Sequence, residues 1–276
     1  MSQENNPEIG QFIDAGGINT NYHDIGDGFP TVLIHGSGPG VSAFSNWRLA
    51  FPVLSKTVRV IAPDMAGFGY TDRPEGIEYN LDTWVKHLID LVDAMKLDKV
   101  NLVGNSFGGA LTIAFSIRYP ERVNRIVLMG AAGVSFELTD GLDFAWGYTP
   151  SFENMRKMLD LFAYDRSLVT DDLARMRYEA SLREGVQESY ASMFPAPRQN
   201  GIDALASDET DIAKIQAPAL IIHGREDRIL PYSNSVRLFE LIPNSQLHLF
   251  GKCGHWTQIE HATRFSKLLT DFFSEE

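Results

Sequence analysis

The chain has 276 residues, 44% of them hydrophobic, which suits one large domain or one domain that carries an insertion. Its net charge is −12, from 24 basic and 36 acidic residues, and it contains no block of Lys and Arg, so a nucleic-acid partner is not expected. No apolar run reaches the length of a membrane-spanning helix, and the polar start Met1–Pro7 lacks the pattern of a secretory signal, so no membrane partner is expected.

A single cysteine, Cys253, is present. One thiol cannot form an internal disulfide, which fits a reducing compartment, and we expect a cytoplasmic protein. It also cannot build a cysteine zinc site, and no metal or other cofactor is expected.

Short apolar runs alternate with helical patterns along the chain. The expected strands are Thr31–His35, Val58–Ala62, Val100–Gly104, Arg125–Met129, Ala219–His223 and Gln246–Phe250. The expected helices are Asn80–Met95, Phe107–Arg118, Ser233–Leu241 and Ala262–Phe273. Nearly continuous apolar runs are typical of strands covered on both faces, so this alternation predicts an α/β fold with a mostly parallel, twisted sheet. The segment before Thr31 is expected to add an antiparallel hairpin at one edge.

Residues 134–208 interrupt this alternation of strands and helices. They show helical patterns with loops, no clear strand, and many aromatic and Met side chains. We interpret them as a helical lid inserted into a core domain formed by 1–133 and 209–276. Most of these apolar side chains are assigned to packing, and some to the wall of a pocket.

The segment Gly104-Asn105-Ser106-Phe107-Gly108 lies where a predicted strand meets a predicted helix. This is the setting of a nucleophile elbow, in which a strained turn lifts the serine hydroxyl above the sheet. The small residues Gly104 and Gly108 leave room for the turn, and Gly109 allows close helix packing. By itself the pentapeptide fits an ordinary structural turn equally well.

The partners expected for Ser106 come later in the chain, in the order acid and then histidine. His248 lies inside an apolar strand and His261 inside the last helical pattern, where it is expected on a solvated face, so neither is favoured. His255 lies in a loop directly after the last strand. Asp227 follows the preceding strand and is preferred to Glu226, although a solvated loop carboxylate is the alternative.

A glycine-rich loop, His35–Gly40, follows the first expected parallel strand. Its position predicts an oxyanion hole formed by the backbone N–H groups of Ser37 and Phe107. His35 itself is expected to be buried and structural. No Gly-Lys-Ser/Thr follows, so the loop is not a nucleotide-binding P-loop.

Several longer strings together resemble the meta-cleavage product hydrolases, the carbon–carbon bond hydrolases of aromatic catabolism. The resemblance covers nearly the whole chain and is carried by HGSGPG, Ser45-Asn46-Trp47, APDMAGFGYTDRP, GNSFGG, FAYDRSLVTDDLARMRYEA, MFPAPRQ, HGREDR and GKCGHWTQIEH. The likeness is greatest to 2-hydroxymuconic semialdehyde and 2-hydroxy-6-oxohepta-2,4-dienoate hydrolases. It implies an α/β-hydrolase fold, a small anionic substrate and a homo-oligomer, often a dimer.

The resemblance also implies roles for individual residues. Arg177, with Asn46 and Asn105, would hold the carboxylate and 2-oxo end of the substrate, since a guanidinium matches a planar carboxylate. Trp256 would line this polar half, and Phe162 would wall the pocket from the lid. Without the resemblance, Arg177 would be a solvated helix residue, Asn105 a helix cap and Trp256 a core residue. An aliphatic side chain at Ile229 suits a hydrogen or small alkyl substituent on the substrate.

The implied reaction is cleavage of a carbon–carbon bond in 2-hydroxy-6-oxo-2,4-dienoates, giving 2-hydroxypenta-2,4-dienoate and a carboxylic acid. Whether Ser106 forms an acyl-enzyme or activates water stays open at this point. A carboxylesterase with the same Ser106, Asp227 and His255 is the alternative enzyme, and a ligand-binding protein without activity is the alternative outside enzymes.

Overall fold

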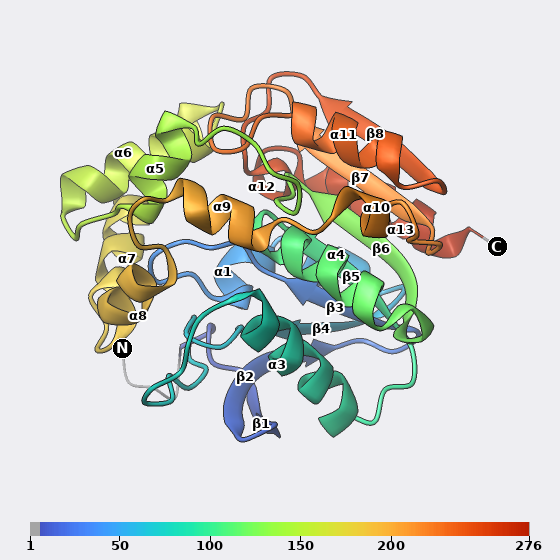
Figure 1. Ribbon diagram of the computed structural model, residues 1–276. Coiled ribbons are helices and arrows are strands. Elements are labelled where there is room, and N and C mark those ends of the chain that lie inside the picture. The colour runs from blue at the N-terminus through green and yellow to red at the C-terminus, as the bar shows by residue number, and fades with distance from the viewer. Residues whose placement is uncertain (1–5, 276) are drawn as a thin grey trace.

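An eight-stranded sheet forms the centre of the computed structural model, which describes residues 6–275 (Figure 1). The strand order is β1-β2-β4-β3-β5-β6-β7-β8. β1 pairs antiparallel with β2, β2 pairs antiparallel with β4, and the other neighbours are parallel. This arrangement confirms the predicted α/β fold and the edge hairpin. The strands are β1 (Gln11–Ala15), β2 (Ile18–Ile25), β3 (Pro30–Ile34), β4 (Arg59–Pro63), β5 (Val100–Asn105), β6 (Val123–Met129), β7 (Ala219–Gly224) and β8 (Ser245–Phe250).

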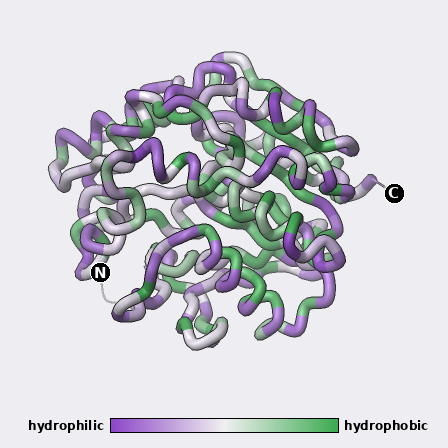
Figure 2. The backbone as a smooth tube through the Cα atoms, viewed as in Figure 1, coloured by the Kyte–Doolittle hydropathy of each residue, from purple (hydrophilic) through white to green (hydrophobic). Residues whose placement is uncertain are grey.

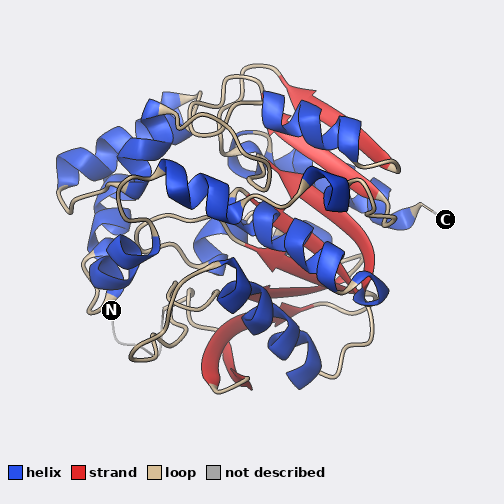
Figure 3. Cartoon of the chain, viewed as in Figure 1, coloured by secondary structure: helices blue, strands red, loops and turns tan. Residues whose placement is uncertain are grey.

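The central strands are apolar on both sides because helices cover both faces of the sheet (Figure 3). Along β3, Val32 and Ile34 pack into one hydrophobic cluster while Leu33 packs into the other. β7 alternates in the same way, since Ile221 and Ile222 belong to opposite clusters. Successive side chains of a strand point to opposite faces, so a continuous apolar run fills both cores. Figure 2 shows these hydrophobic stretches gathered in the central strands.

The four predicted long helices are present as α3 (Leu81–Ala94), α4 (Phe107–Arg118), α11 (Ser233–Leu241) and α13 (Ala262–Ser274). Four short helices and one 3₁₀ turn were not predicted, because four or five residues cannot display a helical period. They are α1 (Ala43–Trp47), α2 (Phe51–Leu54), α10 (Glu209–Ile212), α12 (Thr257–Glu260) and η2 (Pro120–Arg122).

The segment between β6 and β7 is helical and lies across one end of the sheet (Figure 1). Thr139, Ser151 and Thr170 cap three of its helices through their hydroxyl groups, which accept backbone N–H bonds in the first turn. Residues 134–208, interpreted above as a lid, contain no strand. Their helices are α5 (Asp140–Trp146), α6 (Phe152–Phe162), η3 (Arg166–Leu168), α7 (Asp171–Ser181), α8 (Val186–Met193) and α9 (Gln199–Leu205).

Two further expectations concern membrane-spanning helices and the position of His261. In the part from Asn6 to Glu275, no helix combines the length and apolar character needed to cross a membrane. The polar start of the chain lies largely outside the described residues. The solvated position expected for His261 is wrong: this side chain is half-buried between α12 and α13, and its ring stacks on Phe250 at 4.8 Å between centroids.

Candidate active site

Ser106 occupies a strained turn between β5 and α4. Its backbone angles are φ 54° and ψ −114°, a conformation that costs a non-glycine residue about 1–3 kcal/mol. Backbone hydrogen bonds hold it there: its N–H donates to the Met129 carbonyl at 2.9 Å, and its carbonyl accepts from Gly109 at 2.9 Å and Ala132 at 3.0 Å. The turn therefore presents the Ser106 side chain at the carboxyl end of the sheet.

The glycines around Ser106 are required by close backbone contacts. A Cβ atom on Gly104 would lie 2.3 Å from the Gly108 carbonyl oxygen, and one on Gly108 would lie 2.4 Å from the Ile34 carbonyl oxygen. A Cβ atom on Gly109 would lie 2.4 Å from the Cβ of Ala131. These distances are too short for any side chain, so the GNSFGG string is needed for strand, turn and helix to pack together.

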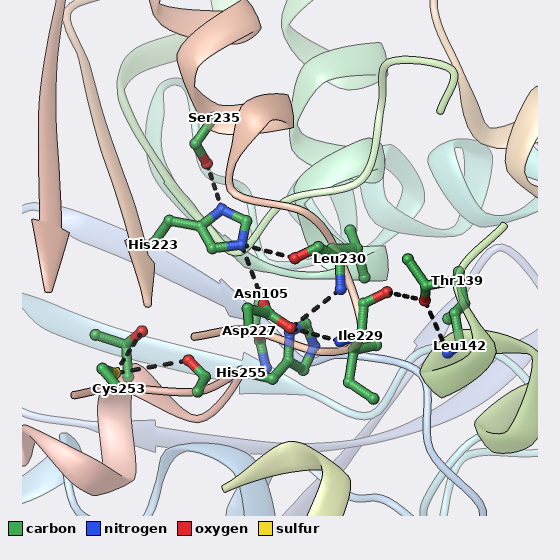
Figure 4. Close-up of polar contacts among 12 residues, drawn as sticks. Asn105, Thr139, Leu142, His223, Asp227, Ile229, Leu230, Ser235, Cys253 and His255 are labelled. Carbon is green, nitrogen blue, oxygen red and sulfur yellow. Dashed lines mark hydrogen bonds and ion pairs between the residues drawn. The ribbon is translucent and has the colours of Figure 1, made fainter. Parts of the chain in front are cut away.

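Asp227 and His255 meet at the same end of the sheet (Figure 4). The Oδ2 atom of Asp227 lies 2.6 Å from His255 Nδ1, and its Oδ1 atom accepts the N–H groups of Ile229 at 2.7 Å and Leu230 at 3.0 Å. Glu226 instead pairs with Arg225 at 2.7 Å, so the preference for Asp227 over Glu226 agrees with this geometry.

The Asp227 carboxylate is stabilised in its ionised form. Burial acts to raise its pKa, but the His255 charge and the hydrogen bonds from the two neighbouring imidazoles outweigh burial, and the pKa falls below its usual range. Asp227 can therefore orient the His255 ring and stabilise a positive charge on it.

Ser106 and His255 both lie beside the end of β6. The Met129 carbonyl accepts the Ser106 N–H, and a Cβ atom on the next residue, Gly130, would lie 3.4 Å from His255 Nδ1 and 3.6 Å from Asp227 Oδ2. Among residues 6–275, no hydrogen bond joins the Ser106 hydroxyl to His255. Hydrogen bonds of this kind often tighten only when substrate is bound. The three residues thus share one corner of the fold, around the end of β6.

A cavity of about 280 Å³ lies beside this corner. Its polar wall contains Arg177, Asn46, Asn105 and Gln258, and no Asp or Glu from the described part of the chain lines it. Phe162 and Trp256 form part of its other wall, with 5.5 Å between their ring centroids, and Phe162 also lies 5.6 Å from His255. Five of the six sequence-predicted substrate residues, all except Ile229, therefore line one space.

Several polar atoms on this wall have no partner. Arg177 Nη2 donates to the Pro39 carbonyl at 3.3 Å, but its buried Nη1 has no acceptor and, within the described residues, the guanidinium forms no ion pair. Asn105 Nδ2 donates to Asn46 Oδ1 at 2.9 Å, which leaves Asn46 Nδ2 and Asn105 Oδ1 unsatisfied. Burial lowers the pKa of Arg177, because removal from water disfavours the charged form. Unpaired buried donors are costly, so this wall is suited to an anionic ligand.

Arg48 and Gln258 also line the cavity, and sequence analysis missed both. Arg48 directly follows the Ser45-Asn46-Trp47 string, but it ends a helix too short to show which face points inward. Its Nη1 donates to the Ser45 carbonyl at 2.6 Å, and burial lowers its pKa. A second cation therefore faces the same space as Arg177.

A second, smaller cavity of about 10 Å³ lies against Ser106. Ser37 and Phe107 line it, and neither backbone N–H donates to another group among residues 6–275. The Ser37 hydroxyl accepts from Trp146 Nε1 at 3.1 Å, which ties the glycine-rich loop to the lid. Two free N–H groups beside a serine are suited to hold an oxyanion. The remaining lining is apolar: Ala132, Phe136, Leu142, Trp146, Ile202, Leu205 and Leu230.

Ile229 is placed differently from the expectation. It is buried but lines neither of these two cavities, whereas its neighbour Leu230 lines the smaller one. The Ile229 carbonyl accepts the Thr139 hydroxyl at 2.7 Å, so this residue connects the Asp227 loop to the lid. Both side chains are buried, but only the one at 230 reaches the cavity beside Ser106, and a linear sequence does not reveal how an irregular loop turns.

His35 and Cys253 are packed beneath the site. Burial lowers the pKa of His35 to about 4, and this neutral ring accepts the Met65 N–H at 3.0 Å. Burial raises the pKa of the Cys253 thiol to about 12. In the described part of the chain, no cluster of three or more His, Cys, Asp or Glu side chains is arranged to hold a metal ion.

Comparison with known proteins agrees with this architecture. A sequence family described as the alpha/beta hydrolase fold matches residues 30–262. A 2-hydroxy-6-oxo-2,4-heptadienoate hydrolase of Pseudomonas putida is 62% identical over 98% of this chain and 98% of its own. A 2-hydroxymuconate semialdehyde hydrolase of Pseudomonas sp. strain CF600 is 58% identical over 99% of this chain and 96% of its own.

Among solved structures, a meta-cleavage product hydrolase mutant from Pseudomonas fluorescens IP01, complexed with acetates, superimposes with a TM-score of 0.96. It is 62% identical, and the match covers 97% of this chain and 98% of that one. With the strained serine turn, the paired Asp and His, and the unpaired Arg of the cavity, these relationships show that the chain belongs to the meta-cleavage product hydrolases of the α/β-hydrolase fold.

Proposed function

We propose that this enzyme hydrolyses the carbon–carbon bond between C5 and C6 of 2-hydroxy-6-oxo-2,4-dienoates that carry hydrogen or a small alkyl group at C6. The observation that carries the proposal is Arg177, which has no ion-pair partner among residues 6–275 and lines a cavity to which those residues contribute no acidic side chain. A carboxylate beside a 2-oxo or 2-hydroxy group supplies the acceptors that Arg177 and Asn46 lack, together with a donor for Asn105 in the hydroxy form.

In the proposed reaction, Ser106, His255 and Asp227 act as a triad. The dienol first ketonises, moving the proton of the 2-hydroxyl to C5, and His255 is the group placed to carry it. The Ser106 hydroxyl, or a water molecule that it activates, then adds to the C6 carbonyl carbon. The resulting oxyanion accepts the N–H groups of Ser37 and Phe107.

Cleavage of the C5–C6 bond sends the electron pair into the conjugated 2-oxo end of the substrate. Protonation there gives 2-hydroxypenta-2,4-dienoate, and C6 leaves as a carboxylic acid, with water supplying the balance of atoms. Arg177 faces the end that receives this negative charge, and Arg48 lines the same cavity. Stabilising charge where it develops is the effect expected to contribute most to the rate.

The small cavity beside Ser106 supports the choice of C6 substituent. It has room for about one water-sized group between apolar side chains that include Leu142, Trp146 and Leu230. A hydrogen or methyl group is no larger than about that size, whereas a phenyl ring would require these side chains to move. The names of the two relatives described above refer to substrates with methyl and hydrogen at this position.

A spectrophotometric screen tests the proposal. Ring-fission products with hydrogen, methyl, isopropyl and phenyl at C6 are supplied, and loss of the yellow dienolate is followed. We expect the hydrogen and methyl compounds to be cleaved with the highest kcat/KM, and Ser106→Ala to lose about 10³-fold or more in kcat. The proposal fails if folded wild-type protein consumes none of the four.

A carboxylesterase with the same triad is the rival activity. An ester without a carboxylate leaves Arg177 unpaired, so the cavity disfavours this alternative. Turnover of simple esters in preference to dienoates would establish it.

We also expect a cytoplasmic homodimer. The buried, unpaired thiol of Cys253 suits a reducing compartment. The sheet ends at the edge strand β8, where Leu249 is 39% exposed, and Phe239 on the adjacent α11 is 43% exposed. Light scattering of the purified protein checks the dimer, because a mass of a single 30.8 kDa chain at micromolar concentration would contradict it.

A further inference from the structure

A second histidine contacts the carboxylate of Asp227 (Figure 4). His223 lies near the end of β7, four residues before Asp227, and its side chain is fully buried. Its Nε2 atom lies 3.0 Å from Asp227 Oδ2, the same oxygen that contacts His255 Nδ1 at 2.6 Å. Asp227 therefore lies between two imidazoles, and only His255 lines the large cavity.

The neighbours of His223 determine which of its nitrogens carries a proton. Nε2 faces two acceptors, Asp227 Oδ2 and the Leu230 carbonyl at 3.2 Å, so Nε2 must be the donor. Nδ1 lies 2.7 Å from the Ser235 hydroxyl, which can donate to it. One neutral tautomer satisfies all three contacts: the two acceptors at Nε2 select it, and the Ser235 hydroxyl completes it by donating to Nδ1.

The arrangement fixes the orientation of the acid. Oδ1 of Asp227 is held by two backbone N–H groups, and Oδ2 is held by His223 on one side and His255 on the other. Without the His223 N–H, Oδ2 would have a single imidazole donor, and the carboxylate could turn away from His255. Rotation of Asp227 would release the His255 tautomer in which Nδ1 is protonated and Nε2 is free to accept a proton.

We infer that His223 is a positioning residue: with Ser235, it fixes the Asp227 oxygen that orients His255. The inference rests on the proposed roles of Ser106, Asp227 and His255, and it assigns His223 no contact with substrate. Because His223 acts on the acid and not on the cavity, its loss should lower kcat and leave KM nearly unchanged.

The test compares variants that keep or remove the donor. His223→Leu removes the N–H, and we expect kcat to fall about 100-fold with KM within about twofold, a loss typical of orienting partners. His223→Gln can place an amide N–H near the same oxygen, and we expect it to recover at least about tenfold of that loss. Ser235→Ala keeps the ring and its contacts at Nε2 but removes the hydroxyl that holds Nδ1, and kcat should fall severalfold.

His87→Leu is the matched control. His87 is also buried and also contacts a hydroxyl, with Nε2 2.8 Å from Thr20 Oγ1, but it lies in the core away from the triad. Circular dichroism at the assay temperature confirms that each variant is folded, and we expect His87→Leu to lose stability but keep kcat. An equal fall in kcat for folded His87→Leu and His223→Leu would overturn the inference, since burial alone would then explain it.

A second readout separates this inference from the substrate assignment. The rate at which a fluorophosphonate labels Ser106 depends on the triad and not on the dienoate. We expect slow labelling of His223→Leu, partial recovery in His223→Gln, and wild-type labelling of His87→Leu. If His223→Leu does not fold, Ser235→Ala decides, and unchanged kcat and labelling would refute the role. Normal labelling of wild type without dienoate cleavage would refute only the proposed substrate.

Discussion

Single residues set the chemistry of this site through what surrounds them. Arg177 was ambiguous in sequence, since an arginine in a charged helix is usually solvated. In the fold its guanidinium lines a cavity that has no carboxylate from the described residues, and one of its nitrogens is buried without a partner among them. The neighbouring groups also distinguish Asp227 from Glu226. Hydrogen-bond donors surround Asp227, whereas Glu226 pairs with the exposed Arg225.

Arg177→Gln tests the anion-binding role at the residue scale. Loss of a charged hydrogen bond costs about 1.5–3 kcal/mol, so kcat/KM for the dienoate should fall about 10- to 100-fold. Steady-state kinetics checks this, with Arg175→Gln as the control because Arg175 is exposed on the same helix, α7. If the two variants behaved alike, Arg177 would not be the anion-binding group.

At the scale of elements, one carboxylate joins the lid to the loop that carries His255. Glu260, in α12, accepts the Gly254 N–H at 2.7 Å with Oε1, and the Tyr164 and Asp165 N–H groups at 2.9 Å with Oε2. His255 itself donates its N–H to the Phe162 carbonyl at 2.8 Å. The end of α6 and the histidine loop are therefore held as one unit.

Glu260→Ala should loosen that unit. It leaves three backbone donors without their acceptor, and the free energy of unfolding should fall by about 1–3 kcal/mol. Hydrogen exchange should quicken at the Gly254, Tyr164 and Asp165 amides, and kcat should decrease. Glu121→Ala, at an exposed position in η2, serves as the control. Unchanged exchange at all three amides would show that Glu260 does not hold the lid.

The whole molecule contains buried histidines that make its stability depend on pH. Burial lowers the pKa of both His35 and His87 to about 4, from 6.5 for an unperturbed histidine. The unfolded chain therefore binds more protons than the folded chain between pH 6.5 and 4. The stabilisation is present above about pH 6.5 and is lost as the pH falls toward 4, by up to about 3 kcal/mol for each histidine.

Asp64 opposes this trend. Burial raises its pKa from 3.8 to about 6, so its contribution is present below pH 3.8 and is lost as the pH rises through 6. Because two histidines act against one carboxyl group, we expect net loss of stability between pH 7 and 5. Urea unfolding at both values measures it, and His87→Gln should show a smaller loss than wild type. An equal loss in the variant would mean that His87 is not held neutral in the fold.

Much of the architecture was predictable because it follows from local pattern. Apolar runs identified the parallel strands, since strands covered on both faces must be apolar throughout. The serine turn was predictable because GNSFGG satisfies contacts that only glycine permits, and Asp227 and His255 because each follows a strand at its carboxyl end. The short helices α1 and α12 were not predictable, and Arg48 and Gln258, which lie beside or within them, were missed for the same reason.

The sequence by itself therefore determined the strand and helix order, the serine turn and the identity of the residues that could serve it. The tertiary structure alone decided which side chains share a space: that Leu230 rather than Ile229 reaches the small cavity, and that Arg48 joins Arg177. It also placed His223 behind Asp227. These relations depend on how irregular loops turn and on contacts between distant segments, and no periodicity along the chain encodes either.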